Sequence, residues 1–267
     1  MAFAPIVTFS SDFGSSGPYV GAVKGAILKI CPQARIVDIS HEISSHNILE
    51  AAFNLACSYS YFPAGTIHLA VVDPGVGSER RGIVVATDRY RFVGPDNGLF
   101  TLVYRREKVK QVISIESERH CRETVSATFH GRDVFGPAAA WMACGTEPER
   151  LGPEITDWQE LPLILLEREE PGRVGGVVLQ VDRFGNVITS VHDRGLQDLL
   201  GNEPVLVEFS AGGRRISRRC RTYAEAPEGE LVYLEGSSGY YEIAIPEGSA
   251  AGVLGLKVGD AVQVRVG

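Results

Sequence analysis

The chain has 267 residues, of which 44% are hydrophobic and 22% charged, so it can bury a large core and form two domains. A formal net charge of -7 offers no basic field that would gather phosphates. We therefore expect no nucleic-acid or membrane partner and favour a small-molecule ligand. The five cysteines are scattered without a CxxC pair, which indicates neither a disulfide framework nor a zinc ribbon. No signal-like start or membrane-length apolar run is visible, so we expect a cytoplasmic protein.

The first half of the chain alternates between strand-like and helix-like segments. Apolar runs at residues 6–10, 34–40 and 66–72 indicate buried strands, separated by two one-faced helices that each end at a proline. Such alternation is typical of a parallel sheet with crossover helices. Residues 1–157 are therefore predicted to form an α/β, Rossmann-like domain with a mainly parallel sheet. Further strands are predicted at residues 82–88, 90–94 and 109–116, and a further helix at residues 134–145.

The composition changes after Pro153. Residues 158–172 are rich in proline and glutamate and have no helical face, which predicts a linker. Beyond it, short β-rich runs alternate with glycine-containing turns, and one short helix is expected near residues 197–200. This pattern predicts a smaller all-β barrel or sandwich at residues 173–267. The β-rich runs are residues 175–182, 186–191, 204–210, 214–220, 230–235 and 240–245.

The most informative polar segment is DPGVGSERR, residues 73–81, which directly follows the third predicted strand. It places a carboxylate and two guanidinium groups in a glycine-containing loop at a strand's carboxyl end, where open α/β sheets bind ligands. A second segment, TFHGRD at residues 128–133, supplies His130 as a candidate partner. Other polar residues lie at strand ends or glycine turns, where Asp and Asn are also common turn formers. These residues are Asp12, Asp96, Asn97, Arg132, Asp182 and Asn186.

Other ligand-binding motifs fit the chain less well. The glycine loop loosely resembles the acidic loop of adenosylmethionine-dependent methyltransferases, but it lacks the third glycine and follows the third strand instead of the first. No GxxxxGK[ST] and no helix-opening GxGxxG motif occurs, so a P-loop is excluded. Asp12, His41, Asp73 and His130 could converge on a metal ion, although no fixed metal-motif spacing is present. Metal-assisted phosphoester hydrolysis is therefore a minority alternative.

Six ordered motifs resemble the S-adenosyl-L-methionine hydroxide adenosyltransferase family, a hydrolase branch related to the fluorinases and chlorinases. The motifs are SDFG, VDPGVGSERR, GPDNGLF, TFHGRDVF, VDRFGNVITS and SSGYYEIA. The resemblance extends from about residue 6 to the end of the chain. Halogenating relatives carry tyrosine where this chain has Asp73, and they lack the histidine found here at His130. The resemblance therefore favours the water-using branch.

The resemblance implies that water cleaves S-adenosyl-L-methionine at the 5′ carbon of the ribose, giving adenosine and L-methionine without a metal or cofactor. It implies that Asp73, Arg80 and His130 hold and activate the water. Arg80 is preferred over Arg81 because its spacing from the aspartate matches the family. A homotrimer with the site at the subunit interface is also implied. The implied substrate contacts are Asp12 at the ribose, Phe129 in the reaction pocket, Asp182, Phe184, Asn186 and Ser237 near the methionine group, and Tyr223, Glu242 and Ile245 around adenine.

The chemistry of the implied reaction is consistent with these residue types. A sulfonium is already a good leaving group, so the difficulty is the weak nucleophilicity of neutral water. Arg80 can supply a permanent positive charge, His130 can accept or relay a proton near neutral pH, and Asp73 can orient its partners. The sequence does not identify which of the three accepts the proton. Two alternatives remain: a module that binds adenosine or S-adenosyl-L-methionine without turnover, and a metal-dependent phosphatase or nucleotidase.

Overall fold

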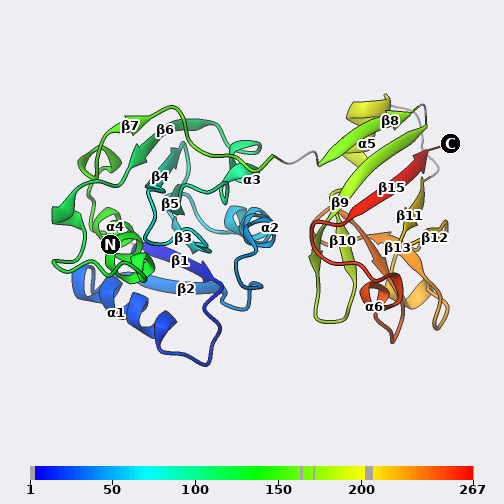
Figure 1. Ribbon diagram of the computed structural model, residues 1–267, viewed down its shortest axis with the longest axis horizontal. Coiled ribbons are helices and arrows are strands. Elements are labelled where there is room, and N and C mark those ends of the chain that lie inside the picture. The colour runs from blue at the N-terminus through cyan, green and yellow to red at the C-terminus, as the bar shows by residue number, and fades with distance from the viewer. Residues whose placement is uncertain (1–3, 163–164, 171, 202–206, 267) are drawn as a thin grey trace. The chain divides into compact units, whose positions relative to one another are not determined.

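The computed structural model describes residues 4–162, 165–170, 172–201 and 207–266. The chain divides into two compact units, Met1–Leu161 (unit 1) and Pro162–Gly267 (unit 2) (Figure 1). Each unit has a hydrophobic core of its own. Among the helices of the described residues, none combines the length and the apolar character needed to cross a membrane.

Unit 1 is built on a seven-stranded sheet with the order β2-β1-β3-β5-β4-β6-β7. The strands β2, β1, β3 and β5 pair in parallel, whereas β4, β6 and β7 pair antiparallel with their neighbours. The bounds are β1 Ile6–Ser11, β2 Arg35–Ser40, β3 Ile67–Val71, β4 Gly82–Thr87, β5 Arg91–Pro95, β6 Val109–Ser114 and β7 Glu154–Ile155.

The predicted α/β architecture is confirmed, but a mainly parallel, Rossmann-like sheet is not. Only the four strands from β2 to β5 in the sheet order follow the parallel pattern. The difference arises between β4 and β5, which are joined by a three-residue turn. A connection that short can join only antiparallel strands, because a parallel pair needs a crossover of a dozen or more residues.

Helices cover both faces of the unit 1 sheet. The predicted helices are confirmed as α1 (Tyr19–Ile30), α2 (Ile48–Ser58) and α4 (Gly136–Ala143), and a short α3 (Thr101–Tyr104) was not predicted. A π-helix, Gly131–Phe135, leads directly into α4 and was not predicted either. Short 3₁₀ helices lie at Tyr59–Tyr61, Glu118–His120 and Pro148–Arg150.

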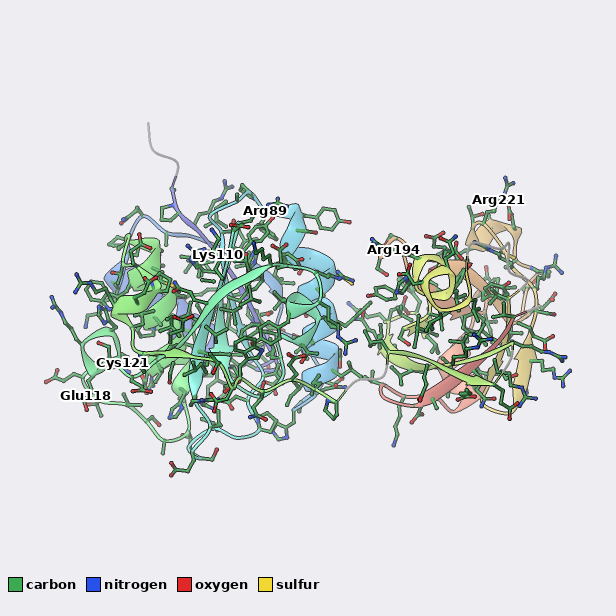
Figure 2. The ribbon with its side chains drawn as sticks, turned by 90° about the horizontal axis from the view of Figure 1, so that it is seen from above. Arg89, Lys110, Glu118, Cys121, Arg194 and Arg221 are labelled. Carbon is green, nitrogen blue, oxygen red and sulfur yellow. The ribbon has the colours of Figure 1, made fainter. Side chains whose placement is uncertain are left out.

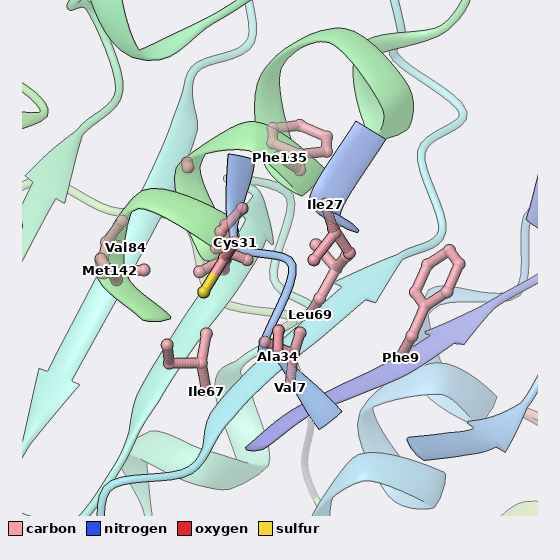
Figure 3. Packing of buried hydrophobic residues seen from close by; sticks show 14 of the residues in the cluster. Val7, Phe9, Ile27, Cys31, Ala34, Ile67, Leu69, Val84, Phe135 and Met142 are labelled. Carbon is pink, nitrogen blue, oxygen red and sulfur yellow. The ribbon is translucent and has the colours of Figure 1, made fainter. Parts of the chain in front are cut away.

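The core between the sheet and the helices α1 and α4 is apolar and closely packed (Figure 3). Phe9 from β1, Ile27 from α1 and Phe135 from the π-helix are all fully buried there. A second cluster, with Leu55 from α2 and Phe92 from β5, covers the opposite face. The central strands are therefore buried on both faces, which gives the loops at their carboxyl ends a rigid base.

Unit 2 is a nearly closed, barrel-like antiparallel sheet with the order β12-β11-β15-β9-β10-β14-β13, and β8 also pairs with β9. This confirms the predicted β-rich unit. The strands are β8 Leu166–Glu170, β9 Arg173–Val181, β10 Val187–Thr189, β11 Val207–Ala211, β12 Arg214–Ile216, β13 Val232–Glu235, β14 Tyr241–Ala244 and β15 Ala261–Val266. The helical segments are α5 Asp193–Leu200, the 3₁₀ helix Tyr223–Glu225 and α6 Ala250–Leu254. The start of the run predicted at residues 204–210 lies outside the described residues.

The two ends of the segment predicted as a linker, residues 158–172, belong to the folded units. The amide of Gln159 donates to Asp96 Oδ1 at 2.7 Å, and the amide of Leu161 donates to Thr101 Oγ1 at 2.8 Å, so this end is fixed to unit 1. At the other end, β8 pairs with β9. β8 is mostly exposed and has the sequence LEREE. This sequence has no alternating apolar pattern, so it did not predict a strand. Residues 163, 164 and 171 of the predicted linker lie outside the described residues.

Charged side chains lie over the surface of both units (Figure 2). In unit 1, Lys110 pairs with Asp88 at 2.5 Å. The arginine-rich run of unit 2 has acidic partners, with Arg218 at 3.2 Å from Glu230 and Arg221 within 3.0 Å of Glu225. These exposed pairs contribute little to stability but reduce the local positive field.

Candidate active site

Asp73, Arg80 and His130 lie together at one edge of the unit 1 sheet. Asp73 follows β3 and Arg80 precedes β4, so both belong to the loop of residues 73–80, here called the Asp73–Arg80 loop. Arg80 Nε donates to Asp73 Oδ1 at 2.8 Å, and Arg80 Nη2 donates to Asp73 Oδ2. The same Nη2 lies 2.7 Å from His130 Nδ1. The side chains of Arg80 and Asp73 are only 11% and 7% exposed, so this ion pair is largely shielded from bulk solvent, and His130 is half-buried.

The contact between Arg80 and His130 fixes the hydrogen positions on the imidazole. A guanidinium group has donors and no acceptor, so His130 Nδ1 must accept this hydrogen bond. Neutral His130 therefore carries its hydrogen on Nε2. Burial lowers the pKa of His130, the Arg80 charge lowers it further, and Asp73 and Asp133 oppose the shift. The imidazole is thus expected to be neutral at pH 7 and to present Nε2–H as a donor.

Close packing around two glycines shapes the Asp73–Arg80 loop. A Cβ at Gly75 would lie 3.2 Å from Arg80 Cγ. Gly77 has φ +79°, and a Cβ there would lie 2.5 Å from the carbonyl oxygen of Ala127. Any side chain at Gly77 would therefore be both strained and in collision with the backbone. The guanidinium group of Arg80 also lies over the Phe135 ring, 5.0 Å from its centroid.

Asp96 and Asn97 fasten both ends of the loop. Asn97 Nδ2 donates to the carbonyl oxygen of Val72 at 2.9 Å, directly before Asp73. Arg81 donates through Nε and Nη2 to Asp96 Oδ2, at 3.1 and 2.7 Å. The predicted turn role is also present, because Asn97 Oδ1 accepts from the Leu99 amide at 3.2 Å. Arg81 therefore holds the end of the loop through Asp96, whereas Arg80 hydrogen-bonds to His130.

Asp12 and Phe129 lie near this cluster in unit 1. Asp12 follows β1 directly, and β1 pairs in parallel with β3, so Asp12 and Asp73 share one edge of the sheet. Asp12 Oδ2 accepts from the His46 amide at 2.9 Å. Phe129 precedes His130 and packs edge-on against Phe13, with 5.7 Å between ring centroids.

In unit 2, a cavity of about 660 Å³ collects five of the predicted substrate contacts. Phe184 stands 79% exposed at this cavity. Glu242 does not line it but accepts a hydrogen bond from Tyr223 Oη, which does. Ser237 is exposed and does not line it. The five predicted residues are Asp182, Phe184, Asn186, Tyr223 and Ile245, and the sequence reasoning missed Pro246, Glu247, Gly248 and Ser249.

Asp182 and Asn186 form a self-contained turn. Asp182 Oδ1 accepts from the amides of Phe184 and Asn186, both at 2.9 Å, and Asp182 Oδ2 accepts from Asn186 Nδ2 at 2.9 Å. At Gly185, φ is +82° and a Cβ would lie 2.2 Å from Ser249 Oγ. The turn is therefore packed against residues 246–249, which the sequence did not predict as part of the cavity. The only sequence signal of this close packing was the glycine in VDRFGN. Burial is the main cause that raises the pKa of Glu242 nearby.

The residues considered for a metal site do not form a ligand set. Within the described parts of the chain, no group of three or more His, Cys, Asp and Glu side chains is placed to hold a metal ion. His41 Nδ1 instead lies 2.8 Å from Ser11 Oγ.

Comparison with known proteins gives one consistent family. Residues 7–152 match the model for the SAM hydroxide adenosyltransferase N-terminal domain, and residues 176–263 match the C-terminal domain. A protein of Thermus thermophilus named (R)-S-adenosyl-L-methionine hydrolase is 42% identical over 97% of this chain and 98% of its own length. A Salinispora tropica protein of the same name is 34% identical over the full length of both chains. A fluorinase of Nocardia brasiliensis is 27% identical over 98% of this chain and 97% of its own.

Solved structures agree with this relationship. The crystal structure of an uncharacterized conserved protein from Thermotoga maritima has a TM-score of 0.87 and 34% identity, covering 97% of this chain and 99% of that one. A conserved hypothetical protein from Thermus thermophilus has a TM-score of 0.79 and 40% identity, covering 98% and 99%. With both family models matched in order and covering most of each unit, the chain belongs to the SAM hydroxide adenosyltransferase family.

Proposed function

We propose that this chain hydrolyses S-adenosyl-L-methionine to adenosine and L-methionine, through attack of water or hydroxide on the 5′ carbon of the ribose. The observation that carries the proposal is the shielded cluster of Asp73, Arg80 and His130 in a member of this family. Four relatives named (R)-S-adenosyl-L-methionine hydrolase support the substrate. Their name also leads us to propose the epimer with R configuration at sulfur as the preferred form.

The cluster of Asp73, Arg80 and His130 can activate the attacking water, which is the difficult part of this reaction. Methionine leaves without protonation because its sulfur is already positively charged, so the site has to make water a better nucleophile. A positive charge close to a bound water lowers the water's pKa, as bound metal ions demonstrate. The Arg80 guanidinium group provides such a charge permanently. A water held in line with the bond that breaks also avoids the entropy of a bimolecular encounter.

We assign separate roles to the three side chains. Neutral His130 presents Nε2–H, so it holds the water oxygen as a hydrogen-bond donor. Arg80 cannot accept a proton, because a guanidinium group has no acceptor. Asp73 has further lone pairs beyond its two bonds to Arg80, so it is the group proposed to accept the proton as the new C–O bond forms.

The substrate contacts are proposed from two kinds of support. The carboxylate of Asp12 suits the ribose diol, and Phe129 lines the reaction pocket beside His130. The unit 2 cavity supports one shared binding surface for the methionine and adenine groups. Asp182 is proposed to act by holding Asn186, since its oxygens serve the turn. The proposed direct methionine contacts are Phe184, Asn186 and Ser237, with Asp182 behind Asn186, and the proposed adenine contacts are Tyr223, Glu242 and Ile245.

We further propose a cytoplasmic homotrimer in which unit 1 of one subunit and unit 2 of its neighbour form each site. The support is the division of the candidate residues between two units and the exposure of Phe184. Co-expression of Asp73→Asn chains with Asn186→Ala/Tyr223→Ala chains tests it. Sites shared between subunits are expected to recover adenosine release, because some then combine two unaltered halves. No recovery in a mixed oligomer verified by mass spectrometry contradicts a shared site.

The pH dependence should follow the state of His130. Its neutral form accepts the Arg80 hydrogen bond, and burial and Arg80 lower its pKa below the usual 6.5. The value of kcat/KM is therefore expected to stay level as pH falls to 6.5 and to decline only below it, as the imidazole becomes protonated. A pH profile with a His130→Gln control, which lacks this titration, checks the assignment. A decline that begins above pH 6.5 and is absent from the control contradicts it.

Substitution of Asn186 should affect binding more than turnover. Asn186→Ala removes a buried amide from the cavity and its bond to Asp182, so KM is expected to rise about tenfold with kcat nearly unchanged. Steady-state kinetics of adenosine release gives both values. Ser237→Ala is compared in the same assay and should raise KM less than Asn186→Ala, because Ser237 does not line the cavity. A larger rise in KM for Ser237→Ala would make Ser237 the main methionine contact and Asn186 a minor one.

One assay separates the proposed function from its alternatives. Purified protein is incubated with each sulfur epimer of S-adenosyl-L-methionine, with and without a chelator, and adenosine is followed by chromatography. We propose that no metal or cofactor takes part, so release should be insensitive to the chelator. Binding without release indicates a binding module, and loss on chelation indicates metal-dependent chemistry. Chloride-dependent 5′-chloroadenosine would contradict the use of water.

A further inference from the structure

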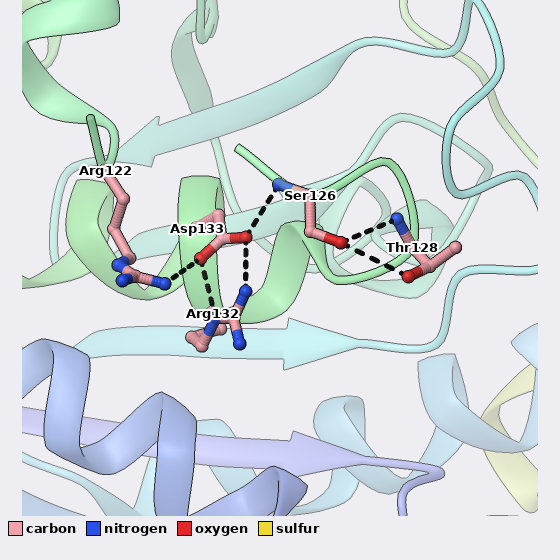
Figure 4. Close-up of polar contacts among 5 residues, drawn as sticks. All are labelled: Arg122, Ser126, Thr128, Arg132 and Asp133. Carbon is pink, nitrogen blue, oxygen red and sulfur yellow. Dashed lines mark hydrogen bonds and ion pairs between the residues drawn. The ribbon is translucent and has the colours of Figure 1, made fainter. Parts of the chain in front are cut away.

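The carboxylate of Asp133 is fully buried and lies at the centre of a polar network next to His130 (Figure 4). Arg122 Nη1 donates to Asp133 Oδ1 at 2.7 Å. Arg132 donates through Nε to Oδ1 at 2.7 Å and through Nη2 to Oδ2 at 2.9 Å. The amide of Ser126 donates to Oδ2 at 2.9 Å. Burial alone would raise the pKa of Asp133, but the bonds from Arg132, Ser126 and Arg122 outweigh burial and lower it to about 2.

This network fixes the segment that leads into His130, residues 122–130. At its start, the Arg122 amide donates to the Asp133 carbonyl oxygen at 2.9 Å, and at its end the Asp133 amide donates to the Phe129 carbonyl oxygen at 3.1 Å. Between these points the segment has no regular helix or strand, and Val125 is 45% exposed. The segment therefore depends on Asp133 for much of its fixed conformation.

The same segment touches both parts of the reaction site in unit 1. The Ala127 carbonyl oxygen occupies the space where a Cβ of Gly77 would lie, so the segment packs on the Asp73–Arg80 loop. The Arg132 guanidinium group lies over the Phe129 ring, 4.8 Å from its centroid. A displacement of about 1 Å in a reacting group can cost roughly a hundredfold in rate. Loosening of this segment would therefore reach the imidazole directly.

We propose that Asp133 is a positioning residue for the reaction: it fixes the 122–130 segment so that the His130 imidazole meets Arg80 and the Phe129 ring stays beside it. This inference rests on the proposed hydrolysis for its effect on turnover. The three charged groups that act on His130 are Arg80, Asp73 and Asp133. Asp133 therefore acts on the imidazole through its charge as well as by fixing its position. A purely structural role would fix the position without any effect of the charge.

The test compares Asp133→Asn, Arg122→Gln and Arg122→Lys, with Asp88→Asn as a matched control at an exposed ion pair. Asp133→Asn is expected to lower kcat about 10- to 100-fold and to change KM less than about threefold. Arg122→Gln is the milder change, because Arg132 still pairs with the Asp133 carboxylate. It is expected to fold even if Asp133→Asn does not, and it should lower kcat about tenfold. Arg122→Lys should recover part of that loss, and Asp88→Asn should show none.

A second readout does not depend on turnover. Nitrogen NMR of the His130 imidazole in the wild type should report the Nε2–H tautomer, and its titration should move to lower pH in Asp133→Asn, because the carboxylate that raises its pKa is gone. Folded Asp133→Asn and Arg122→Gln with wild-type kcat and an unmoved titration overturn the inference. If the wild-type protein releases no adenosine, the proposed function is contradicted. The NMR titration still shows in that case whether Asp133 positions His130.

Discussion

An Asp73→Asn variant is expected to lose about 10²- to 10⁴-fold in kcat, the range for removal of a positioned acid or base, while substrate binding changes little. The amide is almost the same size as the carboxylate, so the fold around the buried side chain should persist. It cannot accept the proton, however, and it offers Arg80 one acceptor where the carboxylate offers two. Single-turnover release of adenosine and equilibrium binding of the substrate measure the two effects separately.

Asp38→Asn is the control for this prediction. Asp38 lies in β2 of the same sheet, where its carboxylate pairs with Lys24 at 2.6 Å and His41 at 3.1 Å, so the substitution removes the same charge away from the cluster. Its kcat is expected to remain within about threefold of the wild type, as for surface ion pairs in general. If Asp73→Asn turned over at the wild-type rate, the role of Asp73 as proton acceptor would be refuted.

An Arg80→Lys variant should lose about 10²- to 10³-fold in kcat even though it keeps the positive charge. Arg80 makes three hydrogen bonds, two to Asp73 and one to His130, from a planar group that also lies over Phe135. An ammonium group is a compact point charge and cannot reproduce this planar geometry. Kinetics of adenosine release should therefore separate the requirement for charge from the requirement for geometry.

The neighbouring Arg81 gives a stringent control. Arg81→Lys alters the bonds that hold Asp96 and Asp157, which fasten the loop from outside the cluster. We expect a lower melting temperature and a loss of less than about tenfold in kcat, because Arg81 contacts no group assigned to the water. A loss for Arg81→Lys that exceeds the loss for Arg80→Lys would reassign the catalytic arginine.

The elements that the sequence predicted well are those with long, apolar periodicity. The strands β3 and β4 are buried throughout and β1 is buried from Val7 onward, so each is mostly apolar in sequence, and α2 has one apolar face. The elements that were missed lack such a signal. The strand β7 has two residues, and the π-helix 131–135 depends on tertiary packing that no local pattern describes. The predicted strand direction is wrong for β4, β6 and β7, because alternating helices and strands indicate parallel pairing only as far as β3, and the three-residue β4–β5 turn requires an antiparallel pair.

The candidate site was predictable where neighbouring residues in a motif carry the chemistry. The loop DPGVGSERR already contained Asp73, Arg80 and the glycines that permit their approach. The distinction between Arg80 and Arg81 rested on family spacing, and the structure brings only Arg80 to the histidine. Two roles became definite only in the structure. Asp133 stands within TFHGRD without a signal of its burial. A turn role for Asp182 was one of the predicted possibilities, and its bonds to the Phe184 and Asn186 amides confirm it.

The most direct test of the account is the origin of the 5′ oxygen in the product. The enzyme is incubated with (R)-S-adenosyl-L-methionine in oxygen-18 water, and adenosine and methionine are analysed by mass spectrometry. Attack of water at the 5′ carbon predicts one oxygen-18 atom at the 5′ position of adenosine, no label in methionine, and release that is lost in Asp73→Asn. Adenosine without the label, or cleavage that leaves sulfur on the nucleoside, would contradict attack of water at the 5′ carbon.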